Sequence, residues 1–245
     1  MKLAAKYYLK SLQNSFLLSF GIILGLSLSF CIFCQFVPIT YVEYRFSSIE
    51  FTSMLFTLVS GVISFHEAFR FFQQNSTTRK SQFMGWTVSL LALSVAEGIL
   101  AVVSNRFLGL FFRYLGMFDQ LYQPLQASTN GALFLVQELL WVCMICLFLG
   151  WAGFAITLLY YRLSKMGKIL VSILVPGTLF ILLPIADHSL LRGGYAWLLE
   201  KAGMLMTGYL PGGIYPMVPV AAALVCSAVL AVLSWLMMRR AEVRS

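Results

Sequence analysis

Charged residues are scarce in this sequence: they make up 11% of its 245 residues, while 60% are hydrophobic. A water-soluble domain of this length needs many more polar side chains to cover its surface, so the composition excludes an ordinary soluble protein. The charges that are present give a net charge of +8. They form short clusters between apolar runs, as membrane-anchoring charges do. They do not form the basic stripe that is typical of nucleic-acid binding. We therefore expect a membrane protein that contacts lipids and binds no nucleic acid.

Residues that commonly carry catalysis are also few. Histidine occurs only twice, and His66-Glu67 begins like the zinc motif H-E-x-x-H. Arg70 stands where the second zinc-binding histidine would be, so that motif is incomplete. The phosphate-binding motif G-x-x-x-x-G-K-[ST] is missing as well. The sequence thus predicts no catalytic residue, no metal ligand and no cofactor or ATP site on this chain.

The five cysteines include two C-x-x-C pairs, which could form a four-thiolate metal site or a redox pair. No flanking loop supplies the turn that such sites use, so we favour cysteines that act as small, apolar-tolerant residues in lipid. They are Cys31, Cys34, Cys143, Cys146 and Cys226.

Apolar runs predict an all-α membrane protein with a single transmembrane domain over residues 1–245. A membrane-spanning helix needs about 20 apolar residues, and the first run has no signal-peptide cleavage site. We expect six spans, over residues 16–36, 51–66, 83–104, 131–160, 169–186 and 216–238.

Three other segments have a mixed character. Residues 1–15 predict an amphipathic helix that lies on the inner membrane face, and part of 105–130 is expected in the interface. Residues 187–215 are apolar but interrupted by glycine and proline, which favours an extracellular re-entrant helical hairpin that helps to gate a pathway. Its turns would lie at Gly193, Gly194, Pro211, Gly212 and Gly213.

Lysine and arginine are distributed unevenly between the two sides of this predicted topology. Twelve of the 17 fall on the side of the N-terminus and five on the other. Basic residues are enriched in cytoplasmic loops, so both termini are expected in the cytoplasm of a multi-pass protein of the bacterial cell membrane.

Two acidic residues, Glu97 and Glu138, fall within predicted spans. An ionised carboxylate near mid-membrane costs roughly 2.5–3.5 kcal/mol, so such residues usually face the bundle interior or water. They could line a transport pathway or pair between subunits. They could equally lie near span ends and reach the interface or bond a neighbouring helix.

Residues 66–82 form a basic, aromatic-rich segment on the predicted cytoplasmic side. Phe69 and Phe72 share an apolar stripe, while Glu67 and Arg70 lie on the other faces. This pattern fits a helix that docks into a groove on a cytosolic partner. It also fits the end of a span followed by an ordinary positive-inside loop.

The stretch E-A-F-R-F-F-Q-Q-N-S-T-T-R-K within this segment resembles the cytoplasmic loop of ATP-binding-cassette type-2 permeases, especially the small Firmicutes type. The resemblance implies the permease subunit of a type V exporter, paired with a second permease copy. It implies that a separate cytosolic ATPase holds ATP and Mg²⁺ and that the cargo is hydrophobic or amphipathic, most commonly a toxin or antimicrobial peptide. The residues it assigns to ATPase coupling are Glu67, Phe69, Arg70, Phe72, Asn75 and Arg79. An intramembrane enzyme and an uncoupled channel or scaffold are the alternatives.

Overall fold

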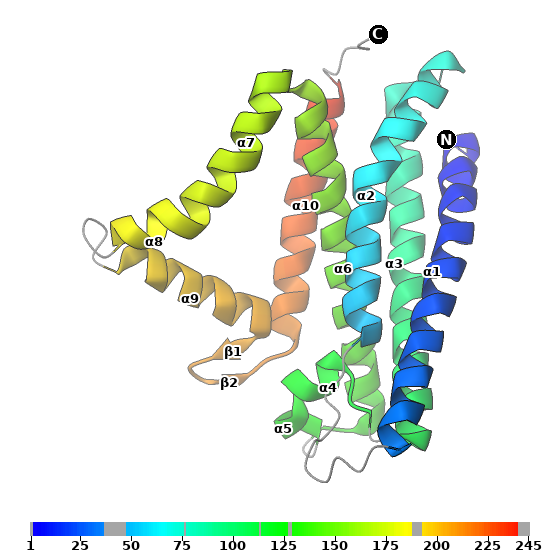
Figure 1. Cartoon of the computed structure of the whole chain (residues 1–245), viewed down its shortest axis with the longest axis vertical. Coiled ribbons are helices and arrows are strands. Elements are labelled where there is room, and N and C mark those ends of the chain that lie inside the picture. Colours follow the sequence, from blue (N-terminus) through cyan, green and yellow to red (C-terminus); the bar gives the residue numbers. More distant parts are fainter. Residues whose placement is uncertain are drawn as a thin grey trace.

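The computed structural model describes residues 2–36, 48–75, 77–112, 114–126, 129–187 and 193–239. Five long helices stand side by side as a bundle (Figure 1). They are α1 (Lys2–Phe36), α2 (Ser48–Gln74), α3 (Arg79–Phe111), α6 (Gly131–Arg162) and α10 (Met217–Arg239). Two short helices, α4 (Met117–Leu121) and α5 (Gln123–Gln126), lie at one end of this bundle.

Helices in the described part of the chain are long and apolar enough to cross a membrane at five places. These are α1, α3, α6, α10 and the segment Lys165–Ala186. The apolar part of α2, Ile49–Phe65, is shorter than a full span. The predicted all-α, multi-pass membrane character is confirmed in this form, while the sixth span stays a prediction.

Glycines let α2 and α6 approach closely, and this contact is the most extensive in the bundle. A β-carbon at Gly61 would lie 3.0 Å from the Phe154 backbone nitrogen, and one at Gly153 would lie 3.0 Å from that of Val62. Small residues at a helix–helix contact allow this close packing in membranes. The close approach brings the polar side chains of α2 and α6 into reach of one another.

Most of the basic residues whose side chains are described belong to helix ends that meet at one end of the bundle, which we call the basic end. There the start of α1, the α2–α3 turn and the end of α10 share one core, in which Tyr8, Phe72, Trp86 and Met238 are buried. Arg79 Nη1 donates to the last backbone carbonyl of α10, at Arg239, at 2.7 Å. The basic residues belong to the start of α1 (Lys6, Lys10), the start of α3 (Arg79, Lys80), the end of α6 (Arg162), the start of the helix that follows α6 (Lys165, Lys168) and the end of α10 (Arg239). Figure 1 draws these helix ends together.

The expected separate amphipathic helix over residues 1–15 is corrected by the structure. No glycine or proline interrupts the chain there, and α1 runs without a break from Lys2 to Phe36. Ala4, Tyr8, Leu12 and Phe16 recur every fourth residue and are buried within the bundle. Packing against neighbouring helices, rather than a membrane surface, covers this apolar stripe.

After α6 the chain leaves the bundle and returns only at α10 (Figure 1). This arm contains α7 (Lys165–Gly177), a π-helical turn η1 (Thr178–Leu182), α8 (Leu183–Ala186) and α9 (Gly194–Thr207), followed by strands β1 (Tyr209–Leu210) and β2 (Gly213–Ile214). The π-helical turn lies between Pro176 and Pro184, whose missing amide protons disrupt the regular helical bonds. None of the residues of α7, η1, α8 and α9 is buried.

The predicted re-entrant helical hairpin is not found as a pair of helices among residues 193–215. Only the helix α9 is present, and the second half is a small antiparallel β-hairpin that turns at Pro211 and Gly212. Gly193 and Gly213 have φ angles of 87° and 142°, which favour glycine, and Gly194 begins α9. Residues 188–192, within the first predicted turn, lie outside the described residues.

Candidate functional site

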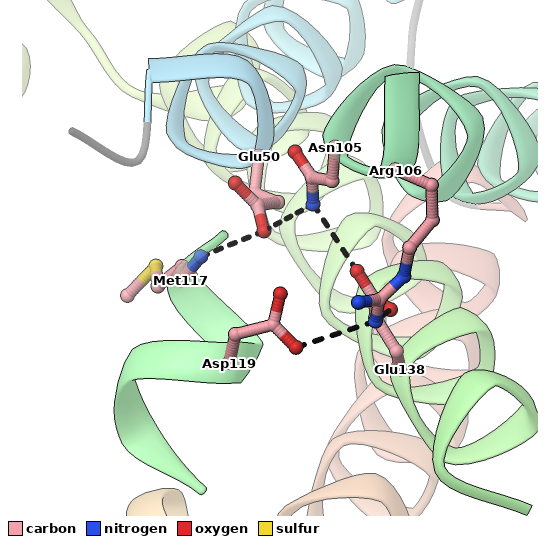
Figure 2. Close-up of polar contacts among 6 residues, drawn as sticks. All are labelled: Glu50, Asn105, Arg106, Met117, Asp119 and Glu138. Atoms are coloured by element: carbon pink, nitrogen blue, oxygen red, sulfur yellow. Dashed lines mark hydrogen bonds and ion pairs between the residues drawn. The ribbon is translucent and has the colours of Figure 1, made fainter. Parts of the chain in front are cut away.

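Polar side chains from four helices meet at the end of the bundle opposite the basic end (Figure 2). We call this group the acid–arginine cluster. Its members are Glu50 on α2, Asn105 and Arg106 on α3, Asp119 on α4 and Glu138 on α6. All of them except Arg106 are buried. Charged groups are seldom buried unless they are paired or hydrogen-bonded, so the arrangement of this cluster defines the candidate site.

Asn105 stands between two carboxylates and bonds both. Its Nδ2 donates to Glu50 Oε1 at 2.8 Å and to Glu138 Oε1 at 3.1 Å. An amide nitrogen carries two protons, so it can serve both acceptors at once. Asn105 therefore separates two like charges that would otherwise repel each other in a medium of low dielectric.

Arg106 supplies the positive charge of the cluster. Its Nη2 bonds Glu138 Oε2 and lies 3.3 Å from Asp119 Oδ1. The arginine side chain is 38% exposed, whereas Glu138 is fully buried. Three carboxylates face one guanidinium, so the cluster would carry an excess of two negative charges if every group were ionised. Glu50 is bound by two neutral donors, the Asn105 amide and the Met117 backbone nitrogen, which donates to Glu50 Oε1 at 2.7 Å.

The short helix α4 closes the site and owes its position to Gly116. A β-carbon at Gly116 would lie 2.6 Å from both Asn105 Nδ2 and Glu50 Oε1, which is too close for any side chain. Phe118 anchors the helix, with its ring fully buried and 5.0 Å from that of Phe134. Glycine followed by this apolar anchor places the Met117 amide and the Asp119 carboxylate over the cluster.

Two tyrosines connect α4 and α5 to the arm, and we call this contact the tyrosine clasp. Tyr122 Oη donates to the Thr207 carbonyl at 2.7 Å, and Tyr209 Oη donates to the Leu121 carbonyl. The two rings stack with their centroids 6.4 Å apart. Burial raises the pKa of Tyr122 to about 12, so its hydroxyl keeps its proton and stays a donor at physiological pH. The clasp ties the end of α9 to the helices that cover the cluster.

A second polar site lies deeper in the bundle, around Glu97 on α3. The Glu97 side chain is fully buried, and Thr57 of α2 is hydrogen-bonded to its Oε2. Thr57 Oγ1 also donates to the Ser53 carbonyl at 2.8 Å. The Cys146 thiol of α6 lies beside Glu97. The α2, α3 and α6 helices thus contribute to both polar sites.

The two acids predicted from the sequence as pathway candidates do not meet. Glu138 belongs to the acid–arginine cluster, and Glu97 belongs to the deeper site with Thr57. Both are buried, so neither side chain reaches out of the bundle to an interface. Bonding to a neighbouring helix, one of the possibilities left open by the sequence, is what the structure shows.

The expected separate docking helix over 66–82 is corrected. Helix α2 continues to Gln74, a short turn follows, and α3 begins at Arg79. Phe72 is fully buried against the rings of Tyr7 and Tyr8, with centroids 5.2 and 5.5 Å away, so it belongs to the core and is no surface anchor.

The other predicted coupling residues divide into two groups. Asn75 Nδ2 donates to the Phe71 carbonyl at 2.8 Å, so Asn75 caps the end of α2, and Arg79 binds the end of α10. The side chains of Glu67, Phe69 and Arg70 lie outside the described residues.

Sequence reasoning missed four of the five members of the cluster. Glu50 falls one residue before a predicted span and was assigned to a loop. Asn105 falls one residue after another span and was assigned to the segment 105–130, part of which was expected in the interface. Arg106 and Asp119 were likewise assigned to an interfacial segment. The signal that could have found them was an acid and an amide at adjoining span ends, on the same side of the predicted bundle.

Cys143 and Cys146, one of the two C-x-x-C pairs, are free thiols buried inside the bundle. Within the described ranges, no group of three or more histidine, cysteine, aspartate or glutamate side chains is arranged to hold a metal ion. Comparison of the chain with protein-family models, curated proteins and solved structures finds no match.

Proposed function

We propose that this chain is the permease subunit of an ATP-binding-cassette exporter and that a separate cytosolic ATPase supplies the energy. The observation that supports the proposal is the way in which three segments pack together at the basic end. There the segment that resembles the permease loop is packed together with the start of α1 and the end of α10. A force that the ATPase exerts on the α2–α3 turn would thus reach α1 and α10 as well as α2 and α3.

The orientation follows from the charges. The basic end carries eight lysines and arginines whose side chains are described, whereas Arg106 belongs to the acid–arginine cluster and Lys201 to α9. Under the positive-inside rule the basic end lies in the cytoplasm and the acid–arginine cluster lies near the outer face. Both termini of a chain in the bacterial cell membrane would then be cytoplasmic, with α2 as the sixth crossing.

The surface offered to the ATPase is the α2–α3 turn. Phe71 is 38% exposed and its ring stacks on Tyr7 at 4.6 Å, while Asn75 and Lys80 are exposed beside it. Aromatic and basic side chains held on a rigid base are common anchors of protein interfaces. Phe71 therefore replaces Phe72 as the aromatic contact in this proposal.

Two exposed apolar surfaces suit a second permease copy and an apolar cargo. One is on the arm and the other lies between α6 and α10. Its helices α7 and α8 form an apolar segment long enough to span, with none of its residues buried within the chain. An open depression of about 560 Å³ lies between α6 and α10, and it is lined mainly by leucine, isoleucine and alanine with Arg162 at its edge. A hydrophobic or amphipathic molecule such as a cytolytic peptide suits these surfaces.

The experiment that tests this function is purification of the tagged chain from its native membranes, followed by mass spectrometry and an ATP-hydrolysis assay. An ATP-binding-cassette ATPase should co-purify in a fixed ratio and hydrolyse ATP. Lys80→Glu reverses a charge at the docking turn and should reduce the recovered ATPase several-fold. Lys201→Glu makes the same change on α9, away from the basic end, and should leave recovery unchanged.

A preparation that contains no P-loop protein and hydrolyses no ATP would contradict the proposal. Equal recovery of the ATPase by both variants would reject the docking turn while leaving the exporter class in place. Size-exclusion profiles of the two variants serve as the folding control.

A further inference from the structure

Among the residues that the structure describes, none near Glu97 carries a positive charge that could balance a carboxylate. Among the described residues, the titratable groups that face it are the thiols Cys143 and Cys146 on α6, and Thr57 faces it from α2. Arg106 lies nine residues further along α3, about 13 Å away at 1.5 Å per residue. The guanidinium of Arg106 is already engaged by Glu138 and Asp119. An ionised carboxylate in such a place would be buried with no described neighbour of opposite charge.

The hydrogen bonds around Thr57 point to a neutral acid. Its oxygen is within bonding distance of both the Ser53 carbonyl and Glu97 Oε2. A hydroxyl has a single proton, and neither acceptor can donate to it unless the carboxyl is protonated. Thr57 Oγ1 is placed to donate to either acceptor and can serve only one at a time. When Thr57 donates to Ser53, the contact with Glu97 requires a proton on the Glu97 carboxyl.

The Glu97 site and the acid–arginine cluster are stacked along the same three helices. Glu50 and Thr57 are seven residues apart on α2, and Glu138 and Cys146 are eight apart on α6. Positions seven or eight residues apart lie on the same helix face, roughly 10–12 Å from each other. Ser53, which is also buried, lies between Glu50 and Thr57 on that face. A line of polar side chains therefore joins the two acids.

The same core is closed on the side of the basic end. Gly61 of α2 lies against the backbone of α6, and Trp86 stacks on Phe154 with centroids 5.2 Å apart, both rings fully buried. On the other side, Glu50 Oε2 and Asn105 Oδ1 are buried acceptors with no hydrogen bond in the described structure. The other carboxylates of the bundle whose side chains the structure describes, Glu50, Asp119 and Glu138, all lie on the side of the cluster.

We propose that Glu97 is a proton-binding site within the α2–α3–α6 core and that its proton exchanges through the acid–arginine cluster. The carboxyl is neutral in the structure seen here, and its proton bridges α3 to Thr57 on α2. Loss of that proton would leave an unpaired charge between three tightly packed helices, so proton release is linked to their separation. This inference concerns the packed core and is independent of the proposed ATPase partner.

Infrared difference spectroscopy of the purified protein tests the protonation state. The spectrum of the wild type minus that of Glu97→Gln at neutral pH should contain the carbonyl band of one protonated carboxyl and no carboxylate bands. Glutamine is neutral and can donate to Thr57, so this variant is expected to fold and to elute as the wild type does. Glu200→Gln, on the exposed face of α9, is the matched control and should remove carboxylate bands instead.

Transfer to deuterated buffer tests the route. The protonated-carboxyl band of the wild type should shift on deuteration, and Glu50→Gln should slow that shift several-fold while Glu200→Gln does not. Loss of carboxylate bands in Glu97→Gln, or failure of that neutral variant to fold, would overturn the protonated site. Equal exchange rates in the wild type and Glu50→Gln would overturn the route through the cluster.

Discussion

Replacement of Gly116 by alanine should lift α4 from the acid–arginine cluster. The added methyl group would lie 2.6 Å from Asn105 Nδ2 and Glu50 Oε1, about 1 Å closer than an ordinary van der Waals contact. The cluster is packed on several sides, so the backbone at 116–117 should move to relieve the clash at the lowest cost in free energy. That movement stretches the bond from Met117 N to Glu50.

The expected loss can be worked out from these contacts. A hydrogen bond to a charged group is worth about 1.5–3 kcal/mol. Overpacking of a tight site costs about 1–3 kcal/mol, and the two costs are alternatives because movement relieves the clash. The backbone φ of Gly116 is −63°, which alanine also adopts, so the variant gains about 0.4–1 kcal/mol from reduced freedom of the unfolded chain. The net destabilisation should be about 0.5–2.5 kcal/mol.

Thermal unfolding in detergent measures this change, and the expected fall in Tm is roughly 1–10 °C for a chain of this size. Hydrogen exchange at Met117 should become faster in the same variant. Gly131→Ala is the matched control, because a β-carbon there meets nothing within 4 Å at the start of α6. An unchanged Tm and unchanged protection of Met117 in Gly116→Ala would refute the position assigned to α4.

Two further predictions concern the cluster and the clasp. Asn105→Asp would place a third carboxylate between two others, so it should destabilise the fold by about 3–5 kcal/mol at neutral pH. Protonation removes the repulsion, so its Tm should rise as the pH falls toward the ordinary carboxyl range; a pH-independent loss would contradict the bridging role. Tyr209→Phe removes the bond to the Leu121 carbonyl, so stability should fall by only about 0.5–1.5 kcal/mol while hydrogen exchange across α4 and α5 increases. Unaltered exchange there would show that the clasp does not hold α9 to these helices.

Hydrophobic runs predicted the long helices. The positions of lysine and arginine between those runs predicted that most basic residues lie on one side. Runs such as 131–160 are long and uninterrupted, and lipid-exposed helices require that composition whatever their partners are. The burial of Glu97 and Glu138 was one of the possibilities open at that point. Their partners were not predictable, because hydropathy gives span ends only to within a few residues and Glu50 and Asn105 lie at those ends.

The sequence also could not predict what covers each apolar side chain. The stripe of Phe69 and Phe72 was interpreted as a surface for a partner, yet Phe72 packs against Tyr8 of α1. Residues 1–15 supplied the covering helix, and periodicity cannot distinguish an apolar face covered by lipid from one covered by another helix. The β-hairpin after α9 was missed for a related reason, since Pro211-Gly212-Gly213 marks a turn without stating which elements it joins.

Site-specific photo-crosslinking at the α2–α3 turn tests the central claim most directly. A photoreactive amino acid at position 75, where the native Asn75 is exposed, should crosslink in native membranes to a protein that carries a P-loop ATPase domain. The same group at position 200, where Glu200 is exposed on α9, should give no such adduct. Mass spectrometry of an ATPase adduct at 75 alone would support an exporter subunit that is driven from its basic end. An ATPase adduct at neither position, or at 200 but not at 75, would contradict the account.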